Sequence, residues 1–216
     1  MLDFIYYLFS YGCTISFFIP VLVFCTVKKT LIKENSALFT LVFFNLFFTL
    51  LAILSQEIYT NCYPAFHVST PILTLLTINY FWRKGISNLI AVISASIVLL
   101  LFVYESIYLN NWFENNLLIA VFSNMCISML SLYHLYIIFI KENENEQDNQ
   151  FKSLFFISSG LFMSNTSSFF FSLNEDKIRS EDYLVLFQYV FPVFMFIYIL
   201  QNVLISWGIW ITQKRS

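Results

Sequence analysis

The sequence predicts an all-helical membrane protein, a single integral membrane domain built as a bundle of seven transmembrane helices. Hydrophobic residues make up 59% of the 216 residues, charged residues only 11%, and the mean hydropathy is +0.74. Soluble domains are about half apolar and about a quarter charged. The apolar residues fall into seven long stretches between short polar segments, and lysine and arginine gather in alternate segments. Lipid is therefore the expected solvent for most of the surface.

Each apolar stretch is long enough to cross the bilayer as a helix, which takes about 20 residues for a hydrocarbon core of roughly 30 Å. Helices are favoured because backbone polar groups in lipid must be paired within the segment. In chain order, the predicted spans are Phe4–Val27, Ala37–Ser55, Tyr63–Trp82, Ser87–Tyr108, Leu117–Ile140, Leu154–Leu173 and Tyr183–Ile211. The first span has no basic segment before it and no obvious cleavage site, so we expect a retained helix and not a signal peptide.

The basic residues predict the orientation, because cytoplasmic loops carry an excess of lysine and arginine. The side that holds the segments after the first, third, fifth and seventh spans has nine of them: Lys28, Lys29, Lys33, Arg83, Lys84, Lys141, Lys152, Lys214 and Arg215. The other side has only Lys177 and Arg179. We therefore expect the N-terminus outside and the C-terminus in the cytoplasm.

Polar residues recur at helical spacing in several spans, which predicts that their polar faces point into the bundle. The candidate cavity-facing residues are Asn45 and Thr49 in the second span, His67, Thr70, Pro71 and Thr74 in the third, Asn124 and Ser128 in the fifth, Asn165 in the sixth, and Gln188 and Asn202 in the seventh. Two interpretations stay open. The polar groups either hold the helices together or line a cavity for a small uncharged molecule.

The sixth span carries small residues one above another on one face. Gly160, Ser164 and Ser168 are four residues apart, and such a stripe lets a neighbouring helix approach closely. We expect these three residues to pack helices, with a polar cavity as the alternative. Pro20, Pro71 and Pro192 lie within spans and predict kinks there.

Several residue types and motifs are absent from the spans, and this argues against several function classes. No lysine, arginine, aspartate or glutamate lies near the middle of a span, whereas ion-coupled pumps and proton relays keep such a charge. The seventh span has no lysine for a retinal Schiff base. Catalytic triads, phosphate-binding loops and zinc motifs are not found, so we expect no enzyme. No basic stripe suggests a nucleic-acid partner.

We expect neither a cofactor nor a bound metal. His67 and His134 lie at depths that differ by roughly 15–20 Å along the helix axis, so they cannot share one haem. The four cysteines, Cys13, Cys25, Cys62 and Cys126, have no metal-binding spacing and are expected to act as small apolar residues.

The whole chain resembles a family of uncharacterised bacterial seven-helix membrane proteins that are often encoded beside histidine kinases. The matching segments are FFIP (Phe17–Pro20), FH (Phe66–His67), FFISSG (Phe155–Gly160) and QNVLISWGIWITQKR (Gln201–Arg215). Family members often carry an acidic residue about two turns after this histidine, where this chain has Leu73 or Thr74. The resemblance implies a place in the bacterial cytoplasmic (inner) membrane and a link to signalling.

Two main hypotheses for the function follow, both with the lipid bilayer as surroundings. The first is a sensory or signal-input component that acts on a cytoplasmic partner, such as a histidine kinase or another membrane protein. Its contact would be the acidic loop at residues 141–152. The second is a facilitator or transporter of a small uncharged solute. A structural subunit of a larger membrane complex is a third option.

Overall fold

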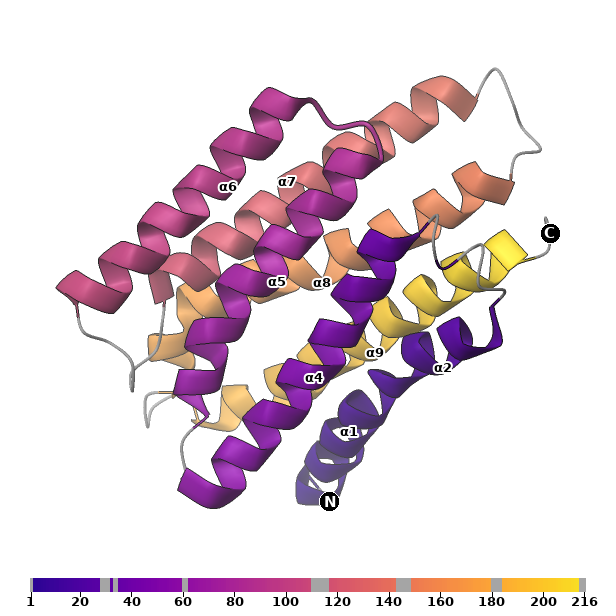
Figure 1. Ribbon diagram of the computed structural model, residues 1–216. Coiled ribbons are helices and arrows are strands. Elements are labelled where there is room, and N and C mark those ends of the chain that lie inside the picture. Colours follow the sequence, from indigo (N-terminus) through magenta and orange to yellow (C-terminus); the bar gives the residue numbers. More distant parts are fainter. Residues whose placement is uncertain are drawn as a thin grey trace.

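The computed structural model describes residues 2–27, 32, 35–59, 62–109, 117–142, 149–179 and 184–213, and its regular structure is entirely helical there (Figure 1). The helices, in order, are α1 (Leu2–Ser16), α2 (Phe18–Thr26), α4 (Ser36–Tyr59), α5 (Tyr63–Arg83), α6 (Asn88–Val103), the π-helix η1 (Tyr104–Tyr108), α7 (Leu117–Glu142), α8 (Asn149–Arg179) and α9 (Leu184–Gln213). Helix α8, with 31 residues, is the longest of these because its polar ends continue the helix beyond the apolar stretch.

Within the described residues these helices form seven rods, because α2 continues α1 and η1 continues α6. We call the end of the bundle with the start of α1 and the ends of α4, η1 and α8 its N-terminal face. The opposite end, with the ends of α2, α5, α7 and α9, is the C-terminal face. The two chain ends lie at opposite faces (Figure 1).

Among the residues that the structure describes, six helical segments are long and apolar enough to cross a membrane. They are Tyr7–Thr26, Ser36–Ile58, Asn88–Tyr108, Leu118–Ile140, Gln150–Asn174 and Tyr189–Thr212. Large apolar side chains also cover the outside of the bundle. On α6 and η1, for example, Leu89, Leu100 and Ile107 are each 69% exposed. The chain is therefore a multi-pass helical membrane protein, as the composition predicts, with a surface suited to lipid contact.

The helix missing from these six segments is α5, which lies inside the bundle. Its main neighbours are α4, α6 and α7, and it lies between α4 and α6 in Figure 1. It buries polar as well as apolar residues, among them His67, Ser69, Thr74 and Thr77. A helix surrounded by other helices needs no apolar surface for lipid, which accounts for its lower hydropathy.

The first rod is interrupted at Phe17, between α1 and α2. Pro20 has no backbone N–H, so the carbonyl of Ser16 loses its normal helical partner at this point. The side chain of Ser16 turns back and donates to the Cys13 carbonyl at 2.6 Å. By contrast, Pro71 and Pro192 lie inside α5 and α9, which continue through them.

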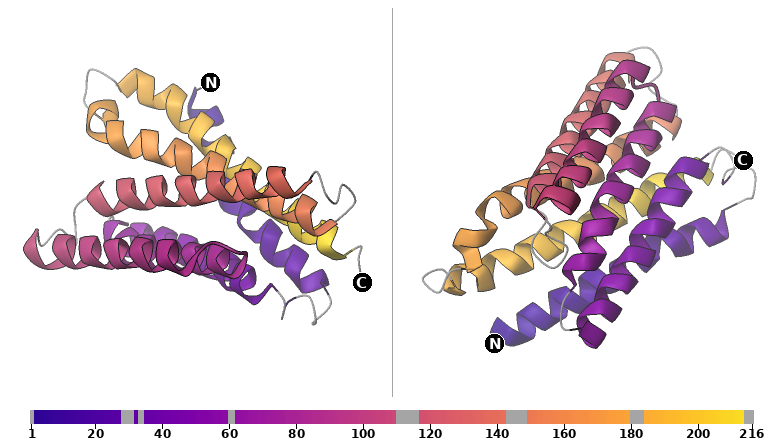
Figure 2. Two further views of the ribbon diagram at one scale, coloured as in Figure 1. Left: turned by 90° about the horizontal axis from the view of Figure 1, so that it is seen from above. Right: turned by 60° about the vertical axis from the view of Figure 1, so that its left-hand side comes forward.

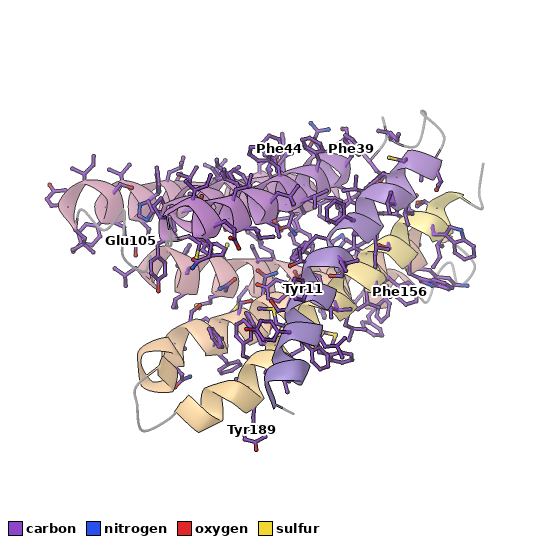
Figure 3. All side chains as sticks on the ribbon, turned by 90° about the horizontal axis from the view of Figure 1, so that it is seen from below. Tyr11, Phe39, Phe44, Glu105, Phe156 and Tyr189 are labelled. Atoms are coloured by element: carbon purple, nitrogen blue, oxygen red, sulfur yellow. The ribbon has the colours of Figure 1, made fainter. Side chains whose placement is uncertain are left out.

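At the N-terminal face, a carboxylate joins two rods. Glu105 lies on η1, is only 2% exposed, and sits beside the start of α7 (Figure 3). Its Oε1 accepts hydrogen bonds from the backbone N–H groups of Leu118 at 2.7 Å and Ile119 at 3.2 Å. A hydrogen-bond acceptor is stabilising at this position because the first N–H groups of a helix lack partners.

The rods are packed most tightly toward the C-terminal face. Phe24, Leu38, Tyr80 and Phe81 are at most 2% exposed and belong to one buried cluster. The ring of Phe24 meets that of Phe39 edge-on, with centroids 5.4 Å apart. Toward the N-terminal face, in contrast, α8 and α9 diverge from α6 (Figure 2). The bundle is therefore wedge-shaped, closed at one face and splayed at the other.

Candidate functional site

A cavity of about 460 Å³ lies between the splayed rods, and every rod except that of α6 and η1 contributes to its wall. Fifteen of the lining residues are polar: Ser10, Thr14, Asn45, Thr49, Ser69, Thr70, Thr74, Thr77, Ser123, Asn124, Ser164, Asn165, Tyr198, Gln201 and Asn202. None of the lining residues is charged. Its volume falls in the usual range for sites that hold small molecules.

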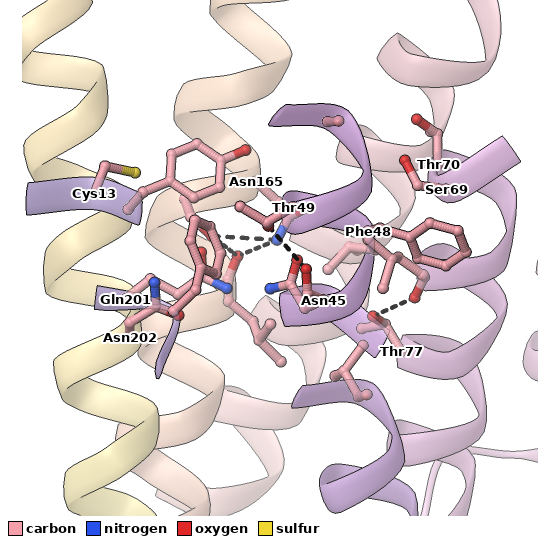
Figure 4. Close-up of a pocket in the computed structure, with 18 of the residues that line it drawn as sticks. Cys13, Asn45, Phe48, Thr49, Ser69, Thr70, Thr77, Asn165, Gln201 and Asn202 are labelled. Atoms are coloured by element: carbon pink, nitrogen blue, oxygen red, sulfur yellow. Dashed lines mark hydrogen bonds between the residues drawn. The ribbon is translucent and has the colours of Figure 1, made fainter. Parts of the chain in front are cut away.

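Amide side chains meet across the cavity. Asn45 on α4 and Asn165 on α8 point toward each other, and Gln201 and Asn202 reach in from α9 (Figure 4). The Asn165 amide donates to the Leu161 carbonyl of its own helix at 2.8 Å. The same amide also donates to Oγ of Ser164 at 3.4 Å, so both hydrogen bonds hold the Asn165 side chain against its own helix.

Two polar atoms on the wall are buried and have no hydrogen-bond partner among the described residues, namely Oε1 of Gln201 and Oγ of Ser123. Gln201 is 5% exposed and Ser123 is 1% exposed. A buried polar atom without a partner destabilises the fold, so native proteins keep few of them. Two of them on one cavity indicate a place where a bound molecule supplies the missing hydrogen bonds.

Asn202 connects the cavity with the interruption in the first rod. Its Nδ2 donates to Oγ of Ser16 at 2.9 Å, although the two residues are far apart in the sequence. Thr14, Phe17 and Pro20, which lie before, at and after the interruption, also line the cavity. A change inside the cavity can therefore act directly on the joint between α1 and α2.

The structure brings seven of the eleven candidate cavity-facing residues to one cavity. These are Asn45, Thr49, Thr70, Thr74, Asn124, Asn165 and Asn202. The small residue Ser164 also lines it. Helical spacing places them there because each lies on the inner side of its own rod.

Of the other four candidates, three do not line the cavity. The Nε2 of His67 lies 2.9 Å from Oγ of Ser106, so this residue contacts η1. Ser128 accepts a hydrogen bond from Thr166 at 3.2 Å between α7 and α8. Pro71 is buried in α5, and the side chain of Gln188 is outside the described part of the structure.

The remaining small residues lie where α8 meets α9. A Cβ on Gly160 would be 3.1 Å from the Gln201 carbonyl oxygen, so α9 approaches closely at this point. Ser168 lies one turn beyond Ser164 and its Oγ is 2.9 Å from the hydroxyl of Tyr198 on α9. These contacts order the part of α9 that carries Gln201.

Several lining residues did not stand out in the sequence, above all Ser123, Tyr198 and Gln201. On α9 the lining residues Phe194, Tyr198, Gln201, Asn202 and Ile205 follow the helical period. This helical spacing is visible in the sequence. The stripe mixes aromatic, aliphatic and polar residues, however, so a search for polar residues alone misses it.

The fold and the cavity together define a class: a multi-pass helical membrane protein with an uncharged, amide-rich cavity. Among the described residues, no group of three or more His, Cys, Asp or Glu side chains could hold a metal ion. No protein-family model, curated protein or solved structure matches the chain.

Proposed function

We propose that this protein is a signal-input component of the bacterial cytoplasmic membrane, which binds a small uncharged molecule in its cavity and passes the change to a cytoplasmic partner. The observation that carries this proposal is the uncharged cavity with two unpartnered buried polar atoms, Gln201 Oε1 and Ser123 Oγ. Such a cavity suits a neutral guest that offers hydrogen bonds.

The proposal includes seven spans, with α5 as the seventh. The length of α5, 21 residues, is sufficient to cross the hydrocarbon core. Its polar residues are compatible with this depth because neighbouring helices surround it, and polar groups within a bundle are normal where they find partners. An odd number of crossings also fits the two chain ends at opposite faces (Figure 1).

The proposed orientation has the N-terminal face outside the cell and the C-terminal face in the cytoplasm. Nine of the eleven lysines and arginines belong to the C-terminal side. Two of them, Arg83 and Lys84, donate to Ser36 and Asn35 at 3.1 Å each, which ties the end of α5 to the start of α4. The splayed end of the cavity would then face the outside.

The packed C-terminal face favours signalling over passage of a solute. A route through the bundle would have to pass the buried cluster of Phe24, Leu38, Tyr80 and Phe81. The interrupted first rod offers a different connection, because α2 runs from the cavity wall at Pro20 to the C-terminal face. A guest that displaces Pro20 or Asn202 can therefore move α2, including its end at the C-terminal face.

A histidine kinase or another membrane protein is the proposed partner, in line with the family that the chain resembles. The acidic loop at residues 141–152 is on the proposed cytoplasmic side. Residues 143–148 of this loop are outside the described residues, so the proposal relies on their charge and position in the chain alone.

The test is a fluorescent label on α2, attached to a Thr26→Cys variant in which the native cysteines are replaced, with the protein in lipid nanodiscs. We expect at least one member of a panel of uncharged alcohols, polyols and amides to change the label's emission with a saturable dose. Asn45→Leu and Asn165→Leu should remove this response. The exposed residue Asn174 provides the control, Asn174→Leu, which should keep it.

The same panel distinguishes a facilitator. If liposomes with the protein take up a panel member, and Asn45→Leu and Asn165→Leu abolish that uptake, transport replaces signalling as the function. If no member changes the emission and none is taken up, the proposal of a neutral guest is wrong.

A further inference from the structure

We propose that the guest is an uncharged amphiphile whose polar end donates hydrogen bonds inside the cavity and whose apolar tail extends toward the surrounding acyl chains. This inference rests on the proposed function, since it names the chemical class of the molecule bound at the same site. It follows from which hydrogen-bonding groups on the wall are already used and from what borders the mouth of the cavity.

The threonine hydroxyl groups that α4 and α5 contribute to the cavity can only accept hydrogen bonds from a guest. Those of Thr49, Thr70, Thr74 and Thr77 each donate to the backbone carbonyl one turn earlier, at 2.7–2.8 Å. A threonine hydroxyl has a single hydrogen, so its oxygen keeps only acceptor capacity. This side of the cavity therefore presents oxygens to the guest and offers it no hydroxyl hydrogen.

The opposite side adds an acceptor that lacks a partner. Gln201 Oε1 is a carbonyl oxygen, which cannot donate, and it is buried with no hydrogen bond from any described residue. Figure 4 shows Gln201 on α9, across the cavity from Thr70 and Thr77 on α5. A guest that satisfies both sides needs donors such as hydroxyl or amide N–H groups.

The guest should also be uncharged. No charged side chain lines the cavity within the described part of the chain, and a charge taken out of water without a partner is strongly disfavoured. Neither a carboxylate nor an ammonium group would find a counter-charge among these lining residues.

The mouth of the cavity borders the lipid-facing surface. Ile53 on α4 and Phe66 on α5 line the cavity although they are 39% and 46% exposed. In a membrane protein, exposed apolar side chains of this kind contact acyl chains. Phe48 and Phe194 continue the apolar wall inward. An apolar tail can lie along this path, whereas a polyol has no apolar group to place there.

The experiment uses the full-length protein in lipid vesicles and a long-chain alcohol with a photoreactive diazirine in its chain. Two matched probes carry the same chain, one as the methyl ether, which cannot donate, and one as the carboxylate. Mass spectrometry locates the adducts. Lipid-facing residues of α6, such as Leu100, serve as the internal reference, because every probe should label them equally.

We expect the alcohol alone to label the cavity residues Phe48 and Phe194, and unlabelled long-chain alcohol to compete while glycerol does not. Gln201→Met should lower cavity labelling about tenfold, which corresponds to the loss of one good hydrogen bond. Ser123→Ala is a second variant that removes a polar atom without adding volume, and it should lower labelling in the same direction. Gln56→Met, at an exposed position outside the cavity, should leave labelling unchanged.

Equal cavity labelling by the alcohol and its methyl ether would overturn the inference, and so would competition by glycerol. Labelling confined to the reference residues would overturn it as well, since the long-chain alcohol then does not enter the cavity. In each of these cases a persisting emission change at Thr26→Cys would show that the proposed function stands and only the ligand class is wrong.

Discussion

Gln201 combines two properties that rarely occur together, a nearly complete burial and a carbonyl oxygen without a partner. Replacing a buried polar group by an apolar one of similar shape is close to neutral or stabilising when that group has no hydrogen bond to lose. Sites of this kind are kept where binding requires them, at some expense in stability.

We therefore expect Gln201→Met to raise the free energy of unfolding of the ligand-free protein by up to about 1 kcal/mol, measured by chemical unfolding in bicelles. Gln56→Met is the matched control and should change little, because Gln56 is exposed. A clear destabilisation by Gln201→Met would mean that this side chain has a structural partner.

Gly208 is expected to be sensitive to a single added methyl group. A Cβ there would lie 2.7 Å from Cγ1 of Ile157 and 2.9 Å from the Ser153 carbonyl oxygen. Gly208→Ala should lower the free energy of unfolding by about 1–3 kcal/mol, because α8 and α9 must separate. Gly12→Ala, whose Cβ would be 3.4 Å from Ile199, should be close to neutral in the same measurement. A neutral Gly208→Ala would contradict this packing.

At the level of residues, helical spacing was a good guide to the cavity where a polar face is unmixed. Asn45 and Thr49 on α4 follow such a face. His67 shares the face of Thr70 by spacing, yet it contacts Ser106 on η1. Whether an inward side chain lies in a cavity or against a neighbouring helix depends on how far the rods diverge. The spacing of residues within one helix does not show this.

Among the helices, the first rod differs most from a regular span because it is broken at Phe17. The proline in the FFIP segment explains the break, and the amide of Asn202 holds the Ser16 side chain beside it. The sequence predicts the kink but not its partner, since Asn202 lies far along the chain.

Pro20→Ala should restore the missing backbone hydrogen bond and straighten this rod. Spin labels at the exposed positions Tyr11 and Thr26 should then move farther apart, toward the roughly 22 Å of axial rise expected for 15 residues of continuous helix. Ile15→Ala, at another exposed position on α1, should leave the distance distribution unchanged. An unchanged distribution for Pro20→Ala would show that proline does not cause the break.

Glu105 is a second feature that acts between helices. Its two bonds to the start of α7 depend on backbone N–H groups of another helix, and such a contact leaves no pattern in the sequence around it.

Glu105→Leu should lower the free energy of unfolding by about 2 kcal/mol, because it removes two hydrogen bonds to backbone N–H groups at the start of a helix. Glu105→Gln keeps a carbonyl acceptor and should recover most of this loss. Chemical unfolding of both variants in bicelles measures the difference. Equal stability of the two variants would show that the carboxyl oxygen does not cap α7.

For the molecule as a whole, composition was sufficient to predict a helical membrane bundle, because lipid demands apolar surfaces and internally paired backbones. Hydropathy identifies six spans among the described residues and omits α5, which packs against α4, α6 and α7. A hydropathy profile assumes that every span faces lipid, and α5 largely does not. The wedge shape could not be predicted, since it depends on how all the rods pack together.

The number of times the chain crosses the membrane decides between six spans and seven. Short epitope tags at the N- and C-termini, probed in cells before and after permeabilisation, measure it directly. Seven spans predict an N-terminal tag accessible from outside and a C-terminal tag accessible only after permeabilisation. Both tags on the same side of the membrane would mean an even number of crossings, and would contradict a bundle in which α5 spans the bilayer and the cavity opens outward.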